Sequence, residues 1–304
     1  MVPHLEERVA ALADLGWTGR DAEWIALVCL HSGVFLRAQY LAFVGRPHPS
    51  AANRFLKRCG QLAVEQPWNG IRQRLCRIAA RPVYRALGAE HVRHRRDAGR
   101  TVLLRRLLSL DYVLEHALEP WLATEAEKVA ALTAAGIPEA VLPRRRYERA
   151  AGSTTRYFAH KLPIALDAER ATFVFVQAED ETARAVRTWG QRHAPLWTAL
   201  RKGGRAVEAV VAGRDAARLA AAEGVLAGWM RAPTSSEDAE IAAALTEAAA
   251  VREALASLDL AALESYGGLN GAGRRIAELE ELAGRRARPA IDNGGTWRST
   301  RVPA

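Results

Sequence analysis

The pattern of apolar and polar residues over 21–88 predicts three short helices. Apolar residues recur every three or four positions in the first helix, which a break at Ser32-Gly33 ends. The same spacing predicts a second helix over 34–43. After a turn rich in glycine and proline, Ser50 is placed to cap a third helix over 51–59.

A β-hairpin is predicted directly after the third helix. Strands over 62–66 and 71–78 flank the turn Trp68-Asn69-Gly70, and Asn-Gly is a strong hairpin signal. Residues 81–85 extend or follow the return strand, whose arginines include Arg72 and Arg74. Three helices followed by a basic hairpin is the order of a winged helix-turn-helix. In that arrangement the third helix enters the major groove of DNA and the wing meets the backbone or the minor groove.

The predicted third helix has two chemically different faces. Its apolar face consists of Ala52, Phe55, Leu56 and Cys59. Its polar face consists of Asn53, Arg54, Lys57 and Arg58. Arginine and lysine can donate to guanine, asparagine can pair with adenine, and all three can reach phosphates. A solvated surface helix shows the same two faces, so it is the order of elements that favours nucleic-acid binding.

The charge of the chain supports this interpretation. Its 304 residues carry a formal net charge of +9 and have a pI near 10.0, which favours a polyanionic partner. Over 46–106 only Glu65, Glu90 and Asp97 oppose a dense set of arginines, whereas the segment beyond Glu237 is more acidic. A GC-rich genome could account for the abundance of arginine, but not for its clustering.

Cysteine and histidine give no sign of a metal centre or a disulfide framework. Cys29, Cys59 and Cys76 form no C-x-x-C pair and are predicted to be buried small apolar residues in a reducing compartment. His91 and His94 have the spacing of half a metal site, but no second pair accompanies them and the neighbouring arginines would repel a cation. No secretory signal or membrane-spanning run is evident, so we predict a cytoplasmic, nucleoid-associated protein.

The remainder of the chain predicts a change of architecture. Helices are expected over 101–118 and 124–135, the second with a Thr124-x-x-Glu127 capping box, followed by a basic loop over 143–147. Further on, the pattern predicts strands within 156–166 and over 171–176 and 206–212. It predicts helices over 180–200, 214–230, 235–258 and 274–282. A loop is expected over 270–273, and an edge strand or mobile tail over 296–302.

These segments give an α+β fold class with four parts. We predict a winged-helix DNA-binding domain over 1–98, a helical connector over 99–150, a small α/β domain over 151–232, and a helical C-terminal segment with a basic tail over 233–304.

A possible active site rests on Asp167, Glu179 and Asp180, which follow predicted strands. Carboxylates at strand ends can bind Mg²⁺ and cleave phosphodiesters. The common nuclease layout also needs an acidic-x-Lys element, and Gln177-Ala178-Glu179 stands where it would fall. Acidic residues at a helix start are also favoured by the helix dipole, which is the preferred interpretation here. No phosphate-binding loop or nucleophile elbow is present, so we predict no cofactor and no metal.

The order of these parts resembles the replication-relaxation proteins of plasmids and integrative mobile elements. The resemblance rests on the winged helix, the segment Val83-Tyr84-Arg85-Ala86-Leu87-Gly88 and the α/β domain, and it covers roughly residues 22–229. It implies a protein that acts on DNA in replication, transfer or their control, with an α/β half similar to restriction endonucleases. Because the lysine is missing, it implies DNA binding more than cleavage.

We therefore predict a homodimeric regulator, or a replication or transfer accessory factor, that binds double-stranded DNA. The predicted contacts are Ser50, Asn53, Arg54, Lys57, Arg58, Trp68, Asn69, Gly70, Arg72 and Arg74. Two alternatives stay open. One is a metal-dependent nuclease that uses the α/β carboxylates, and the other is a scaffold whose basic face binds an acidic protein surface.

Overall fold

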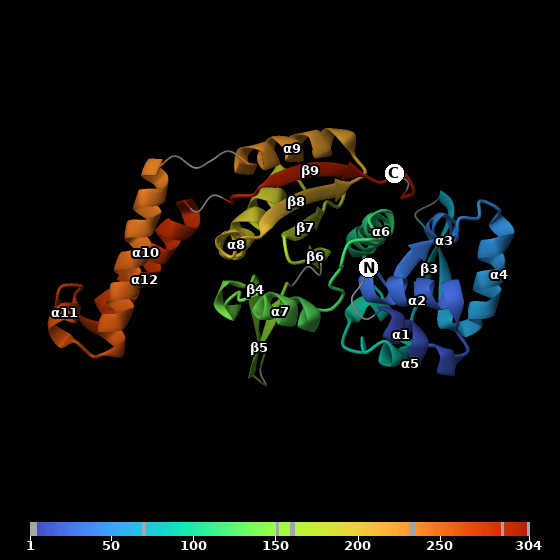
Figure 1. Cartoon of the computed structure of the whole chain (residues 1–304), viewed down its shortest axis with the longest axis horizontal. Coiled ribbons are helices and arrows are strands. Elements are labelled where there is room, and N and C mark those ends of the chain that lie inside the picture. The colour runs from blue at the N-terminus through green and yellow to red at the C-terminus, as the bar shows by residue number, and fades with distance from the viewer. Residues whose placement is uncertain are drawn as a thin grey trace.

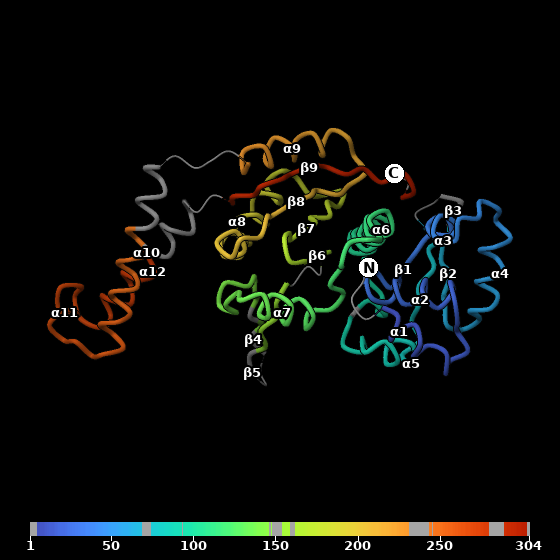
Figure 2. The backbone as a smooth tube through the Cα atoms, in the orientation of Figure 1, coloured from blue at the N-terminus to red at the C-terminus, as the bar shows by residue number. Residues whose placement is uncertain are grey.

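The computed structural model describes residues 5–68, 71–149, 152–158, 162–230, 235–286 and 289–302. It is a mixed α+β structure with three regions (Figure 1). A small three-stranded sheet with helices lies at one end, a four-stranded sheet occupies the middle, and a helical arm projects from the other end (Figure 2). Among the described residues, no helix combines the length and apolarity needed to cross a membrane.

The region that contains the predicted DNA reader is here called the α2–β3 unit and comprises residues 19–78. Its elements are α2 (Gly19–His31), β1 (Val34–Leu36), α3 (Arg37–Val44), α4 (Pro49–Cys59), β2 (Ala63–Trp68) and β3 (Ile71–Ile78). The three strands form an antiparallel sheet in the order β1-β3-β2. Before it lies α1 (Leu5–Ala11), which packs on α2.

The helix predicted over 34–43 is wrong in its first turn. Residues 34–36 form β1, with Phe35 opposite Cys76 of β3, and the helix begins only at Arg37. Gly33 adopts a φ of +76°, and a Cβ there would lie 2.4 Å from the carbonyl oxygen of His94. A glycine is therefore required at this break, and it turns the chain into the sheet instead of a helix.

One local prediction in this unit is also wrong, and one just after it is decided between its two alternatives. The cap of α4 is His48, whose side chain accepts from the Ser50 backbone N–H at 3.3 Å, while Ser50 lies inside the first turn. Pro49 begins the helix at a position where a backbone N–H would have no acceptor within the helix, so proline loses no hydrogen bond there. Residues 81–85 follow the return strand, as one of the two predicted alternatives has it, and lie in α5 (Arg81–Ala86), where Pro82 occupies the first turn.

Helix α6 (Arg100–Glu115) joins the α2–β3 unit to the four-stranded sheet. Gln39 of α3 donates to the backbone oxygen of Leu107 at 2.9 Å. From the sheet side, Ser299 donates to the buried carboxylate of Asp111 at 2.6 Å, and Arg301 forms an ion pair with it at 3.1 Å. One apolar core contains residues of both regions, from Leu12 to Val302 along the chain, and α6 packs inside it between the two regions.

The four-stranded sheet has the order β6-β7-β8-β9, with strands β6 (Ile164–Leu166), β7 (Arg170–Val176), β8 (Ala206–Gly213) and β9 (Asn293–Arg298). β6 is antiparallel to β7, and the other two pairings are parallel. Helices α8 (Ala183–Lys202) and α9 (Ala216–Met230) cover one face, and α6 covers the other. The sheet of the predicted α/β part is therefore mixed, and β9 adds a strand from the predicted C-terminal tail.

The predicted helical connector is only partly helical. It includes α7 (Glu125–Ala134), whose capping box is confirmed because Thr124 accepts from the Glu127 N–H at 3.2 Å. The expected basic loop is instead β4 (Arg144–Arg149), which pairs with β5 (Gly152–Tyr157). This hairpin spans the expected boundary near residues 150–153, of which 150 and 151 lie outside the described residues.

The arm consists of α10 (Ser235–Ala256), α11 (Leu260–Glu264) and α12 (Gly268–Arg286). α10 and α12 lie side by side, joined by an ion pair between Arg275 and Glu247 at 2.8 Å (Figure 2). The loop predicted over 270–273 is wrong, because these residues continue α12. The small apolar clusters of the arm are separate from the main core.

Candidate functional site

Helix α4 is held in place by the aromatic packing of its apolar face. Phe55 is buried and stacks on Tyr40, with 4.4 Å between ring centroids. The same ring lies 6.0 Å from both Trp17 and Phe35. Ala52 and Cys59 are buried on the same side, as the spacing predicts. A helix anchored in this way presents its opposite face in a fixed orientation.

That opposite face carries the five predicted contact residues of α4, and all five are exposed. They are Ser50, Asn53, Arg54, Lys57 and Arg58. Arg54 and Lys57 form no hydrogen bond or ion pair with the described part of the chain. Their side chains are therefore available to an external partner.

Arg58 has a structural role that the sequence did not reveal. Its guanidinium forms an ion pair with Asp21 of α2 at 3.0 Å and donates to the backbone oxygen of Gly16 at 2.7 Å. It also lies 4.5 Å above the ring of Trp17. To reach a base, Arg58 would first have to give up these contacts, so it positions α4 against α2.

A polar network joins α4 to the hairpin. Asn53 accepts from Arg37 at 2.8 Å, and the same guanidinium pairs with Glu65 of β2 at 2.8 Å. Arg74 of β3 lies 3.6 Å from the other oxygen of Glu65. Sequence reasoning missed Arg37 and Glu65. The only available signal was that Glu65 is the lone acidic residue between positions 46 and 89.

The tip of the hairpin is only partly described. Trp68 is 4% exposed and belongs to the main core, so the prediction that it contacts DNA is not supported by its position. Its indole supports the hairpin from inside. Asn69, Gly70 and the side chain of Arg72 lie outside the described residues.

The carboxylates of the alternative nuclease site are not brought together. Asp167 precedes β7 and accepts from the backbone N–H groups of Glu169 and Arg170 at 2.8 and 2.6 Å. Glu179 follows the other end of β7. Seven residues of strand separate the two ends by roughly 20 Å. No group of three or more His, Cys, Asp or Glu that could hold a metal occurs among the described residues.

Glu179 instead lies in a cleft of arginines at the carboxyl ends of the parallel strands. It pairs with Arg214, and with Arg100 at 3.3 Å, and the lining also includes Arg218, Arg298 and Asp215. The cleft has a volume of about 490 Å³. Burial and the neighbouring arginines lower the pKa of Arg214. Such a site disfavours a cation, and Glu179 acts as a counterion within it.

The remaining candidate chemistry lies inside the core. All three cysteines are buried and free, as predicted. Burial raises the pKa of Cys59 to about 12, and burial also raises the pKa of Cys29 and Cys76, so the thiols stay protonated. His94 is buried, with Nδ1 3.2 Å from the backbone oxygen of Cys29. It therefore packs within the protein and is not placed as a surface metal ligand.

Comparison with known proteins adds no further constraint. No family model, curated protein or solved structure matches the chain.

Proposed function

We propose that this chain binds double-stranded DNA, with the α2–β3 unit acting as a winged helix. The observation that supports this most directly is the combination of topology and surface. A helix, a strand, two helices and a hairpin follow in this order, and the strand and the hairpin form a three-stranded sheet. Beside the hairpin, α4 exposes Arg54 and Lys57, which pair with none of the described residues. This is the arrangement in which a helix is offered to the major groove and a hairpin to the flanking backbone.

The dimensions of α4 suit this task. Its eleven residues span roughly 16 Å, and the major groove is about 12 Å wide. Because Arg54 and Lys57 lie one helical turn apart, both can face the same stretch of duplex. Ser50, at the exposed start of α4, is placed to reach a phosphate.

The other polar residues divide into contact and support. Asn53 is oriented by Arg37, so its amide is held at the surface of α4. Arg74 pairs with Glu65 but remains exposed, so it can also contact the DNA backbone. Arg58 acts indirectly by fixing α4 against α2. Homodimer formation and a role in regulation, replication or transfer on a mobile element are parts of the same proposal, as is association with the nucleoid.

Fluorescence anisotropy tests the proposal. The full chain is titrated onto its own upstream DNA and onto a scrambled duplex across a salt series. A preference of roughly a hundredfold for the upstream DNA at physiological salt would indicate a regulator. Equal binding with a steep salt dependence would indicate backbone contacts and an accessory role.

The decisive variant is the double substitution Arg54→Ala and Lys57→Ala. It should lower DNA affinity, and removing each phosphate interaction should reduce the log–log salt slope by about 0.9. Arg187→Ala is the matched control, because this exposed arginine lies on α8, away from the α2–β3 unit. If the double variant and the control bind DNA alike, the proposal that α4 is the reader is wrong.

A further inference from the structure

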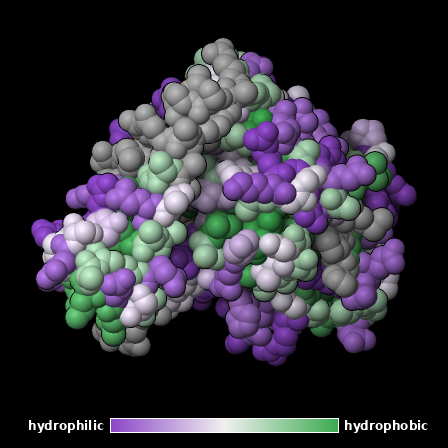
Figure 3. Space-filling model, turned by 60° about the vertical axis from the view of Figure 1, so that its left-hand side comes forward, coloured by the Kyte–Doolittle hydropathy of each residue, from purple (hydrophilic) through white to green (hydrophobic). Residues whose placement is uncertain are grey.

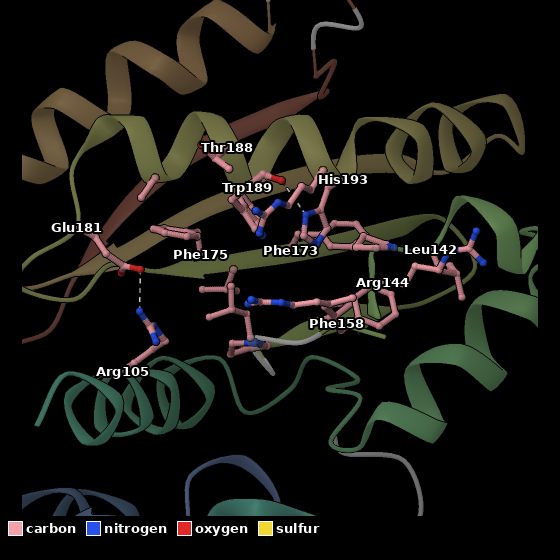
Figure 4. Close-up of a pocket in the computed structure, with 18 of the residues that line it drawn as sticks. Arg105, Leu142, Arg144, Phe158, Phe173, Phe175, Glu181, Thr188, Trp189 and His193 are labelled. Atoms are coloured by element: carbon pink, nitrogen blue, oxygen red, sulfur yellow. Dashed lines mark hydrogen bonds and ion pairs between the residues drawn. The ribbon is translucent and has the colours of Figure 1, made fainter. Parts of the chain in front are cut away.

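A large hollow lies beside β7, away from the proposed DNA-reading helix. It is bounded by β7, by the face of α8 that looks toward the sheet, and by the chain before β4 and after β5 (Figure 4). Its volume of about 990 Å³ lies at the upper end of the range for small-molecule pockets. DNA binding by the α2–β3 unit gives this part of the molecule no role.

Aromatic side chains form the interior of the hollow. Phe173 and Phe175 point from β7 toward α8, where Trp189 and His193 lie (Figure 4). The rings of Phe175 and Trp189 are 5.4 Å apart, and those of Phe173 and His193 are 5.9 Å apart. His193 is oriented by its Nδ1, 2.8 Å from the backbone oxygen of Trp189. These contacts hold the rings in place, so the apolar wall is preformed.

Helix α8 contributes two adjacent rows of residues to the hollow. The apolar row consists of Ala185, Trp189 and His193. The polar row consists of Arg184, Thr188 and Arg192. Both rows have four-residue spacing, which places their members on one face of a helix. The same face thus offers an apolar surface with a line of hydrogen-bond donors along its edge.

The lining is positively charged. Five of its residues are arginines, at positions 105, 144, 145, 184 and 192, and only Asp180 and Glu181 are acidic. Glu181 is already paired with Arg105 of α6 at 2.7 Å (Figure 4). Arg184 and Arg192 are exposed and form no side-chain hydrogen bond or ion pair with the described part of the chain. The charge at the edge of the hollow is therefore not neutralised from within.

We infer that this hollow binds a small organic anion with an apolar body. The apolar body packs on Trp189 and Phe175, and a carboxylate, sulfonate or phosphate group accepts from Arg184 and Arg192. Arginine matches such planar or branched anions through its fork of donors. The face shown in Figure 3 has the same mixed character, with apolar surface near its centre bordered by hydrophilic side chains.

Titration of the full chain with 8-anilinonaphthalene-1-sulfonate tests the inference, because this fluorescent probe combines aromatic rings with an anionic group. One saturable site per chain is expected. The double variant Arg184→Ala and Arg192→Ala should bind the probe at least tenfold more weakly, since it lacks both charge-assisted donors. The control variant, Arg187→Ala with Gln191→Ala, changes exposed residues of the same helix outside the hollow and should bind as the wild type does.

Two further measurements separate a built site from adventitious dye binding. Ala185→Trp places a bulky ring beside Trp189 in the hollow and should weaken probe binding at least tenfold while the circular dichroism spectrum and thermal transition are retained. 1-Naphthoate should displace the probe at least tenfold more effectively than neutral 1-naphthalenemethanol. Equal displacement by the two competitors, or equal probe affinity of the double variant and its control, would overturn the inference. So would an unchanged probe affinity in the folded Ala185→Trp variant.

Discussion

Helices α4 and α8 both carry exposed arginines, but they differ in what lies beside those charges. On α4 the apolar face is closed, because Phe55 is stacked on Tyr40 inside the core. On α8 the apolar row borders a hollow of about 990 Å³. Cations on a helix whose apolar face is fully packed suit a long polyanion such as DNA. Cations at the edge of an apolar hollow suit a small organic anion. The shape beside the charge, more than the charge, distinguishes the two proposed partners.

The comparison extends to the interiors of the two regions. The α2–β3 unit buries its chemically reactive groups, His31 and the three cysteines, in a packed core. The region around β7 also buries its aromatic rings, but these rings line the wall of a hollow. Each of the following predictions tests either the division of roles between the two surfaces or the closed character of the first interior.

The largest effect is expected from charge reversal on α4. The double variant Arg54→Glu and Lys57→Glu replaces two attractive contacts with repulsion, so DNA affinity should fall roughly a hundredfold or more at physiological salt. The anionic probe should bind as before, because the hollow is unchanged. Anisotropy and probe fluorescence on the same preparation check both expectations. A parallel loss of probe binding would show that the two surfaces are not independent.

A smaller effect, on the pH dependence of the free energy of unfolding, is expected from His31. Burial, together with the nearby charges of Lys128 and Arg8, lowers the pKa of this side chain to about 3. The unfolded chain takes up a proton below about pH 6.5 while the folded chain does not, so stability falls as pH drops from 6.5 toward 3. By pH 5 this group should lower the free energy of unfolding by about 2 kcal/mol relative to pH 7.

Urea unfolding at pH 7 and pH 5 measures this effect. The comparison is between the wild type and His31→Leu, in which the contribution of this group to the pH dependence is removed while those of all other groups remain. If both proteins lose the same stability between the two pH values, His31 is accessible to protons in the folded state and the core of the α2–β3 unit is not closed.

Arg58 and Arg54 should differ in their effect on stability. Arg58→Ala removes an ion pair and a cation–π contact, so the free energy of unfolding should fall by about 1 kcal/mol. Arg54→Ala removes no hydrogen bond or ion pair to the described residues and should change stability by less than about 0.5 kcal/mol. Chemical unfolding of the two variants side by side provides the measurement. Equal stabilities would mean that Arg58 does not hold α4 against α2.

The smallest effect concerns the thiols. Because burial raises the pKa of all three cysteines, the native protein should react with 5,5′-dithiobis(2-nitrobenzoic acid) only slowly at pH 8. After unfolding in urea, Cys29, Cys59 and Cys76 should all react promptly. Rapid release of the coloured product from the native protein would show that this interior opens readily.

The order of the elements was largely predictable, because helix periodicity and turn residues are local signals. The return strand over 71–78, the capping box at Thr124 and the two faces of α4 all follow from residues within one or two turns of each other. The strand at 34–36 was missed because three residues are too short to show a period. Only its pairing with β3 identifies it as a strand.

The parts of the site that were missed depend on contacts between distant residues. Arg58 and Asp21 are 37 positions apart, and no spacing rule links them. Asp167 and Glu179 look close along the chain, but a full strand lies between them. The hollow has walls drawn from α6, the segment 140–145, the chain after β5, β7 and α8, so no single stretch of sequence contains its signal.

The pairing of β9 with β8 has a consequence for how the protein is made. About 80 residues, including the whole arm, separate the end of β8 from the start of β9. At roughly 5–20 residues per second, a ribosome needs on the order of 4–16 s to deliver the second strand after the first. During that interval the edge of β8, most of whose residues are apolar, has no partner strand. The nascent chain is therefore prone to aggregate between the synthesis of β8 and that of β9, and slower translation would lengthen the exposure.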